Sequence, residues 1–412
     1  MSAQPPLGRE TKRNSRRTFL QVSAAASAAM AMRIMTEPML AAEAAQRDKS
    51  FHPTSGVMIN ANENPLGPCD AARSAIAAMA PQGGRYSDWL TDDLAKVFAE
   101  PEGLKPDDVK VFPGSSGPLH FAVLSFTSPT RSYVTADPGY EAGMRAAKMA
   151  GARVVNVPLT ETYAHDVKAM VAAAPDAGLF YVCTPNNPTG TLTPHADIAW
   201  LVANKPKGSI VLVDEAYIHF AGGPSAIDLV KAGQDVIVLR TFSKIYGMAG
   251  IRCGFAIGRP ELTTPLGDRS GYSAMPITAV AAATASLRHE HLIAERREIN
   301  TKIRRATFEW LNKQGYSYVP SESNCFMLDT KRPAKEVIQA MAARGVYIGR
   351  IWPVWPTYTR ITIGTPAEME EFQAAFQKVM TNAIATGWEP PALRKPRGED
   401  GQVWPMSAGE SS

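Results

Sequence analysis

Between residues 96 and 275 the chain alternates short apolar runs, rich in β-branched residues, with alanine-rich stretches of helical periodicity. This alternation is typical of a mostly parallel β-sheet covered by helices. Seven runs have the length and composition of strands: Val109–Phe112, Ser132–Thr135, Arg153–Val157, Leu179–Cys183, Ile210–Val213, Val236–Leu239 and Cys253–Ile257. The pattern therefore predicts an α/β fold with one large, mostly parallel seven-stranded sheet.

After Met275 the pattern changes to a long helical segment, 279–314, followed by shorter strands interleaved with helices. The strands are expected at Tyr318–Val319, Cys325–Leu328, Val346–Ile348 and Tyr358–Ile363. We therefore assign residues 45–95 to an N-terminal arm and part of a small domain, 96–275 to the large domain, and 276–387 to a C-terminal small α+β domain. Residues 388–412 are dominated by proline, glycine and charge and are expected to form a loose tail.

The N-terminal segment has the features of a targeting signal. Arg16 and Arg17 form a twin-arginine pattern, which is followed by an apolar run over 22–32 and by small residues near 40–45. We interpret residues 1–44 as a signal peptide that directs a chain folded in the cytoplasm to the twin-arginine export machinery and the periplasm. The apolar run is too short for a permanent membrane span. Because Arg33 and Glu37 interrupt the pattern, a basic tail ahead of an alanine-rich helix is the alternative.

Charge and cysteine usage exclude two classes of function. The first 44 residues hold six basic and three acidic side chains, so the remaining chain carries 37 basic and 36 acidic residues and no basic block between residues 50 and 390. This balance does not favour nucleic acid as a partner and points to a small molecule. Four scattered cysteines, with neither a C-x-x-C pair nor histidines at ligand spacing, make a metal site unexpected. We assign these cysteines to packing, although a disulfide is conceivable after export: Cys69, Cys183, Cys253 and Cys325.

In an open α/β sheet, ligands bind at the carboxyl ends of the strands. Small residues that include Ser115 and Ser116 follow the first strand and could hold a phosphate at the start of a helix, or simply form a turn. Tyr140 lies in the turn after the second strand, and Asn187 lies in a loop after the fourth strand whose prolines and glycine restrict its conformation. Each of these features alone also occurs in ordinary turns.

Two further strand ends carry ionisable groups. Asp214 ends an apolar strand, where an unpaired carboxylate would be costly, and Tyr217 follows three residues later. Lys244 follows the strand 236–239, and Arg252 lies eight residues beyond it. A lysine at a strand end is usually only solvated, but an amine beside a buried acid can take part in imine and proton-transfer chemistry.

Taken together and in this order, these residues resemble the fold-type-I aminotransferases of class I and II, in particular the histidinol-phosphate aminotransferase branch. The resemblance begins at the segment Asn60–Pro68, ends at Arg360–Gly364 and so covers nearly the whole chain after the signal. It implies a pyridoxal 5′-phosphate (PLP) cofactor, a small-molecule amino donor and a 2-oxo acid acceptor. It also implies a homodimer.

The resemblance implies a role for each candidate residue. Lys244 would hold the cofactor as a Schiff base and move the α-proton, and Asp214 would pair with the pyridine nitrogen. Asn187 and Tyr217 would bind the phenolic oxygen, and Tyr140 would stack on the ring. The remaining cofactor contacts are implied for Ser115, Ser116, Thr241, Ser243, Arg252 and, from a neighbouring subunit, Tyr86.

At the substrate end, the resemblance implies that Arg360 binds an α-carboxylate. Asn62 is a further candidate substrate ligand, and Arg350 is a candidate second anion ligand, offset from the position where the branch usually carries one. Trp352 and Trp355, in the aromatic loop before Arg360, could form an apolar wall for the substrate side chain, or one or both could merely pack the small domain or the dimer contact. A PLP-dependent decarboxylase of a (phospho)amino acid and a non-catalytic amine-binding protein are the alternatives to an aminotransferase. The sequence does not name the donor.

Overall fold

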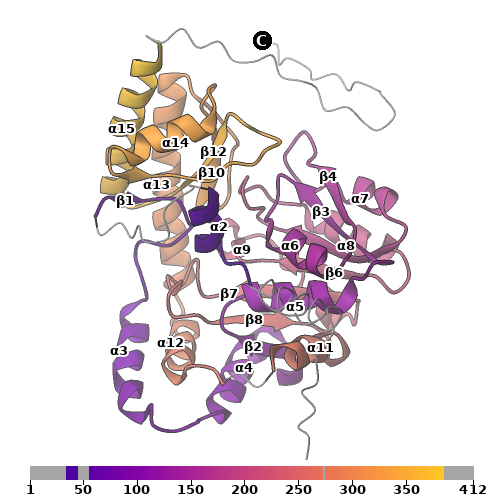
Figure 1. The fold of residues 1–412 in the computed structure, drawn as a ribbon. Helices are drawn as coiled ribbons and strands as arrows, with labels where there is room; N and C mark the ends of the chain where they lie inside the picture. The colour runs from indigo at the N-terminus through magenta and orange to yellow at the C-terminus, as the bar shows by residue number, and fades with distance from the viewer. Residues whose placement is uncertain (1–33, 45–54, 272–273, 385–412) are drawn as a thin grey trace, which may run out of the picture.

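The structure is a computed structural model that describes residues 34–44, 55–271 and 274–384. Within this part of the chain a seven-stranded sheet forms the centre of a large domain, and a smaller domain with its own sheet lies against it (Figure 1). The predicted signal sequence before residue 34 and the predicted tail from 388 lie outside the described residues. None of the helices described is long and apolar enough to cross a membrane.

The central sheet has the strand order β2-β8-β7-β6-β5-β3-β4. All pairings are parallel except those of β8, which runs antiparallel to both of its neighbours. The prediction of seven strands in a mostly parallel sheet is confirmed. The strands are β2 (Val109–Phe112), β3 (Ser132–Asp137), β4 (Val154–Pro158), β5 (Ala177–Cys183), β6 (Ile210–Asp214), β7 (Val236–Thr241) and β8 (Gly254–Ile257).

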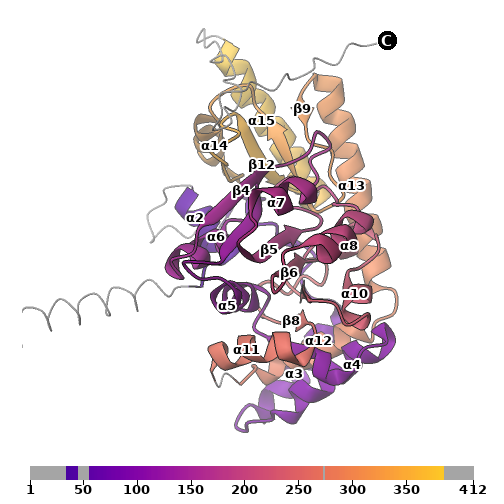
Figure 2. The same ribbon diagram turned by 90° about the vertical axis from the view of Figure 1, so that its right-hand side faces the viewer.

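Helices cover both faces of this sheet, as the apolar strands require. In Figure 2, α5 and α6 lie on one side of the strands, and α8 and α10 lie on the other. The helices between β2 and β8 are α5 (Ser116–Phe126), α6 (Ala142–Met149), α7 (Val167–Ala173), α8 (His195–Asn204), α9 (Ile218–Ala221) and α10 (Ile227–Lys231).

Three further helices pack together below β2 and β8 (Figures 1 and 2). They are α3 (Asp70–Met79), α4 (Trp89–Glu102) and α12 (Ile277–Leu287), and α11 (Pro260–Ser270) lies beside them. Ala72, Leu94 and Ala283 are buried in the same apolar core as the central strands. The segments 70–95 and 277–287, which the sequence placed with the arm and the small domain, thus pack with the large domain because their apolar faces meet there.

The small domain has a separate apolar core around Leu328, Ile361 and Phe372. Its antiparallel sheet has the order β12-β10-β9, and a parallel pair joins β1, near the N-terminus, to β11. Its elements are β1 (Val57–Met58), β9 (Ser317–Tyr318), β10 (Cys325–Asp329), β11 (Val346–Tyr347), β12 (Tyr358–Thr362), α13 (Leu292–Gln314), α14 (Ala334–Ala342) and α15 (Pro366–Ile384). The one long helix expected over 279–314 is interrupted and forms α12 and α13.

The short helix α2 (Glu37–Ala44) lies between the two domains (Figure 1). Met35 and Leu40, on either side of Glu37, are buried in the apolar core of the large domain. Residues 34–41, which the sequence analysis placed inside the signal peptide, are therefore packed against the folded protein. All four cysteines are free and buried, in agreement with a packing role.

Candidate active site

The parallel register of the sheet brings the ends of β5, β6 and β7 into line. Asp214 pairs with Cys183 of β5 on one side and with Leu239 of β7 on the other. The loops that follow these strands carry Asn187, Tyr217 and Lys244. The main-chain geometry therefore gathers side chains that are far apart in the sequence, as expected for the carboxyl edge of an α/β sheet.

Lys244 lies in the loop after β7 and is buried. Its Nζ donates hydrogen bonds to the carbonyl oxygens of Asn62 (2.9 Å) and Ala61 (3.4 Å), and it lies 5.5 Å from the centre of the Tyr217 ring. Burial lowers the pKa of Lys244 to about 8, from the 10.5 of a free lysine. About a tenth of this amine is therefore neutral and nucleophilic at pH 7, far more than for a free lysine.

Asp214 is buried at the end of β6 and is held by two neutral donors. The hydroxyl of Tyr181 donates to Oδ2 (2.9 Å), and the backbone N–H of Ala216 donates to Oδ1 (3.1 Å). Burial raises the pKa of Asp214 to about 6, although these two hydrogen bonds act in the opposite direction. Within the described residues Asp214 has no ion-pair partner, so a cation placed beside it would be strongly favoured.

Hydroxyl groups and backbone carbonyl groups surround the side chain of Arg252. Nη1 of Arg252 donates to Ser243 Oγ (2.9 Å), which in turn accepts a hydrogen bond from Thr241 Oγ1 (3.0 Å). Gly114 has a φ of +84°, and a Cβ there would collide with the Arg252 guanidinium, so glycine is required. Helix α5 begins at Ser116 without a side-chain cap, which leaves its first N–H groups available to an anion.

These groups line an open cavity of about 830 Å³, a volume that includes solvent-accessible space. Ten of the residues that the sequence nominated lie on its wall: Ser115, Ser116, Tyr140, Asn187, Asp214, Tyr217, Thr241, Ser243, Lys244 and Arg252. The structure thus brings an amine, a buried acid and a polar anion cradle into one cavity.

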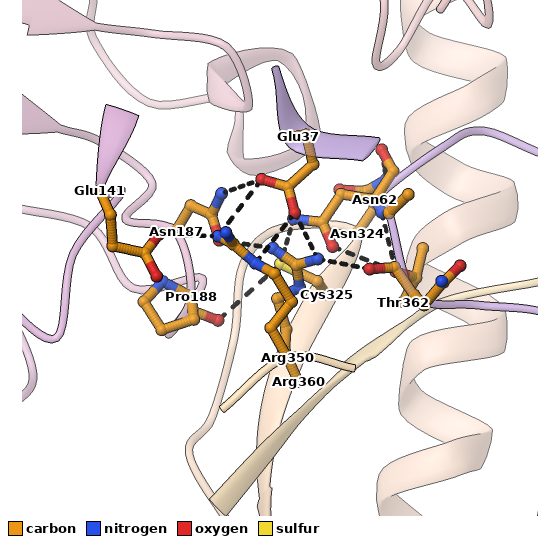
Figure 3. A network of polar contacts seen from close by, with 12 residues as sticks. Glu37, Asn62, Glu141, Asn187, Pro188, Asn324, Cys325, Arg350, Arg360 and Thr362 are labelled. Atoms are coloured by element: carbon orange, nitrogen blue, oxygen red, sulfur yellow. Dashed lines mark hydrogen bonds and ion pairs between the residues drawn. The ribbon is translucent and has the colours of Figure 1, made fainter. Parts of the chain in front are cut away.

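The small domain adds a pair of buried arginines beside this cavity (Figure 3). Nη1 of Arg360 donates to Asn187 Oδ1 (2.8 Å), and the Arg360 guanidinium lies 5.7 Å from the centre of the Trp352 ring. Arg350 lies 4.7 Å from the same ring, and its Nη2 is 3.0 Å from Oε2 of Glu141. The two guanidiniums therefore share one aromatic support but have different polar partners.

The comparison with known families decides which chemistry this arrangement serves. Residues 54–376 match the model of the family described as aminotransferase class I and II. The chain belongs to this aminotransferase family.

Individual relatives agree with this assignment. The chain is 32% identical over 331 residues to a histidinol-phosphate aminotransferase of Moorella thermoacetica, across 79% of this chain and 85% of the relative. It is 35% identical over 323 residues to an aromatic amino acid aminotransferase of Nocardia farcinica, across 77% and 89% of the two chains. The structure of the Sinorhizobium meliloti histidinol-phosphate aminotransferase in complex with pyridoxal-5′-phosphate aligns with a TM-score of 0.74 and 25% identity, covering 86% of this chain and 97% of that one.

The chain is thus an aminotransferase with the fold-type-I architecture, and its cofactor is PLP. The cavity fits this cofactor on chemical grounds. Asp214 provides a buried carboxylate that lacks a cation, which suits a protonated pyridine nitrogen, and the cradle at Arg252 suits the phosphate. Lys244 provides the amine that an aldehyde requires.

Tyr217 and Asn62 form a hydrogen-bonded pair beneath Lys244. Nδ2 of Asn62 donates to the Tyr217 hydroxyl (3.0 Å), and Oδ1 of Asn62 accepts from Thr362 Oγ1 (3.1 Å). Asn62 has a φ of +54°, an unusual backbone conformation that these two bonds and the adjoining chain hold in place. Asn62 therefore links strand β12 of the small domain to the site. Its carbonyl oxygen binds the amine of Lys244, so Asn62 lies at the catalytic lysine as well as being a candidate substrate ligand.

Trp352 and Trp355, the two tryptophans of the loop before Arg360, lie in different surroundings. Trp352 is buried beneath both arginines, and its Nε1 donates to the carbonyl of Gly139 (2.8 Å). Trp355 instead packs against Tyr163 and Tyr358, and neither tryptophan lines the cavity. Both tryptophans therefore pack within the protein, and their contacts with Gly139 and Tyr163 join the loop of the small domain to the large domain.

Tyr86 does not lie at the cavity of its own chain. Its side chain is 81% exposed, in the segment just before α4. Its predicted contact with the cofactor of a neighbouring subunit stays a prediction.

Three residues of the site have no counterpart among the sequence-based candidates: Glu37, Glu141 and Tyr181. Glu141 directly follows Tyr140, so the turn after β3 could have suggested it. Tyr181 lies two residues before the end of β5, and its apolar neighbours in the sequence indicate a core residue. Glu37 was considered only as an interruption of the signal pattern, and no local feature of the sequence indicates that it reaches the arginines.

Proposed function

We propose that this aminotransferase acts on amino acids with apolar or aromatic side chains and transfers their amino group to a 2-oxo acid. Arg360 is proposed to bind the α-carboxylate, because its planar guanidinium is buried and held in place by Asn187 (2.8 Å) at the edge of the cavity. Lys244 would accept the α-proton of the bound substrate, because burial lowers the pKa of its amine.

The cofactor supplies an electron sink for the carbanion that forms when the α-proton leaves. Asp214 would pair with the pyridine nitrogen and favour its protonated form, and Tyr181 fixes the orientation of the Asp214 carboxylate. Tyr217 and Asn62 hold their hydroxyl and amide groups next to Lys244. The side chains of the protein thus orient the substrate and transfer its α-proton.

The preference for an apolar side chain rests on the ion pair between Arg350 and Glu141 (3.0 Å). A phosphate monoester carries a charge of about −1.5 to −2 at neutral pH. Of the two arginines at this end of the site, Arg350 is paired with Glu141, so only the charge of Arg360 remains for a substrate that replaces Glu37. The positive charge left over suits a single α-carboxylate better than a phosphate.

The relatives include both histidinol-phosphate and aromatic amino acid aminotransferases, so a donor screen is the appropriate test. The holoenzyme should be assayed with 2-oxoglutarate and with phenylalanine, tyrosine, leucine or histidinol phosphate as donor. We expect the highest kcat/KM for an aromatic or aliphatic amino acid. A tenfold advantage for histidinol phosphate, equivalent to about 1.4 kcal/mol, would overturn the proposal.

The variant Glu141→Gln sharpens this test, because it removes the acid that faces Arg350 and leaves Arg360 unchanged. We expect kcat/KM for histidinol phosphate to rise about tenfold, since Arg350 then keeps only Glu37 as a carboxylate partner and attracts the phosphate more strongly. The aromatic donor should change by less than about threefold. The exposed residue Glu161 offers a matched control, Glu161→Gln, which should change neither value.

We also propose a homodimer in which Tyr86 reaches the partner's cofactor. Tyr86 (81% exposed) and Trp89 (60% exposed) lie close together in the chain, and two large exposed aromatic side chains favour a protein interface. Light scattering should give the mass of two chains. Mixed dimers of inactive Lys244→Ala and impaired Tyr86→Ala should be more active than either parent protein, because one of their two sites has both Lys244 and the partner's Tyr86. A monomer, or no restoration after subunits exchange, would contradict the proposal.

Export through the twin-arginine pathway is proposed from Arg16 and Arg17, which lie outside the described residues. Replacing both with lysine should leave the protein in the cytoplasm, because the machinery reads the arginine pair. The test compares periplasmic and cytoplasmic fractions by immunoblot. Equal periplasmic amounts of both forms would contradict export by this route.

A further inference from the structure

The start of helix α2 and the residue before it form part of the wall of the cavity. Thr36, Glu37 and Pro38 line the cavity together with the candidate cofactor ligands. The segment is anchored on both sides of Glu37, because Met35 and Leu40 are 7% and 3% exposed. Glu37 is therefore held at the site by the packing of its neighbours.

The carboxylate of Glu37 lies among the groups proposed to bind the substrate carboxylate (Figure 3). Its Oε1 is 2.6 Å from Nη2 of Arg360, and its Oε2 accepts a hydrogen bond from Nδ2 of Asn187 (3.1 Å). Arg350 adds contacts of 3.3 Å from Nε and 3.4 Å from Nη2. One carboxylate thus binds two guanidiniums and an amide, the same donor types that a substrate α-carboxylate requires.

The charge state of Glu37 agrees with this contact. Burial alone would raise its pKa, but the attraction of Arg350 and Arg360 outweighs burial and lowers the pKa to about 2. Glu37 is therefore ionised at every pH at which the enzyme would operate. Two carboxylates cannot share this position, because they would repel each other inside a buried site and would divide the donors of Arg360 between them.

We propose that the mouth of the active site is a docking surface for residues 34–44 of the same chain, in which Glu37 is an internal competitor of the substrate carboxylate. A substrate must displace Glu37 from Arg360 before it can bind. Cleavage of the predicted signal after residue 44 would remove the competitor together with the signal. The proposal rests on the proposed role of Arg360 as the carboxylate ligand.

The first test measures carboxylate binding to the full-length holoenzyme without turnover. The probes are 3-phenylpropanoate and succinate, which lack an amino group, and their affinity is measured by calorimetry. Glu37→Ala should bind both at least tenfold more tightly than wild type, with Glu37→Gln in between. The KM of the amino donor should fall by a similar factor at unchanged kcat. Glu161→Gln, the exposed control, should behave as wild type.

Hydrogen exchange gives a second readout that a merely structural role for Glu37 would not produce. Saturating 3-phenylpropanoate should accelerate amide exchange in α2 of the wild-type protein, because the displaced helix loses its contacts at the site. Exchange in β6 should not increase. Arg360→Lys in the Glu37→Ala background tests the underlying role of Arg360 separately, since it should abolish the gain in affinity.

The outcomes distinguish the two proposals. Unchanged or weaker carboxylate binding in both Glu37 variants would overturn the proposal that Glu37 competes with the substrate. Tight binding that survives Arg360→Lys would overturn the proposal that Arg360 binds the substrate carboxylate. The expected result is a gain in affinity on loss of Glu37, together with faster exchange in α2 when the carboxylate binds. Slower or unchanged exchange in α2 would contradict the proposal.

Discussion

Tyr181 donates a 2.9 Å hydrogen bond to Asp214 from the neighbouring strand. Both residues are buried, and β5 and β6 pair so that Cys183 lies opposite Asp214. The acid at the centre of the site is thus oriented by a side chain of the core. This relationship predicts that Tyr181 positions Asp214 although it does not line the cavity.

Replacing Tyr181 with phenylalanine should lower kcat about tenfold and change the donor KM little. The hydroxyl contributes about 1.5–3 kcal/mol as a hydrogen bond to a charged group, part of which a water can replace. Asp214→Asn should be more severe, by orders of magnitude, because it removes the charge itself. Steady-state kinetics of the holoenzymes measures both. Tyr133→Phe is the control, since Tyr133 stacks on Tyr181 with ring centres 6.3 Å apart but does not bind Asp214. Equal losses in Tyr133→Phe and Tyr181→Phe would contradict the positioning role.

The lowered pKa of Lys244 predicts how cofactor capture depends on pH. Only the neutral amine attacks an aldehyde, so the rate for the cofactor-free protein should rise with pH and level off above the pKa of about 8. Stopped-flow absorbance of the cofactor band between pH 6 and 10 measures this rate. A rate that continues to rise tenfold per pH unit up to pH 10 would indicate an ordinary lysine and contradict the effect of burial.

The two tryptophans of the loop 349–356 should behave differently on truncation. Trp352→Ala should lower kcat/KM about tenfold or more for every carboxylate donor, because the ring supports the guanidiniums of Arg350 and Arg360. Trp355→Ala should reduce the melting temperature with little change in kcat/KM, because its ring packs on Tyr163 and Tyr358. Loss of the preference for aromatic donors in Trp355→Ala alone would show that this tryptophan does contact the substrate side chain.

The sequence predicted the large sheet well because its strands are buried on both faces. Short runs of β-branched and apolar residues, such as Ile210–Val213, are typical of strands buried on both faces of a parallel sheet. Polar residues that directly follow such runs must then lie at one edge of the sheet. For this reason Asp214, Asn187 and Lys244 could be nominated together without any knowledge of their distances.

The features that the sequence did not predict depend on contacts between distant segments. Helix α12 is apolar and could belong to either domain, and only its contact with α3 places it in the large one. Glu141 and Glu37 are ordinary acidic residues in the sequence, and they acquire a role only because Arg350 and Arg360 approach them from the small domain. Ion pairs between two domains produce no periodic pattern in the sequence, so the sequence alone does not predict them.

The attachment of the cofactor to Lys244 can be measured directly. The holoenzyme is reduced with borohydride, digested with trypsin and analysed by mass spectrometry. Because a modified lysine blocks trypsin, we expect an uncleaved peptide from Thr241 to Arg252 that carries one reduced pyridoxyl phosphate group on Lys244. The group should be absent from Lys244→Ala treated in the same way. An unmodified Lys244 in wild-type protein saturated with PLP, or a stable adduct on another lysine, would contradict the account.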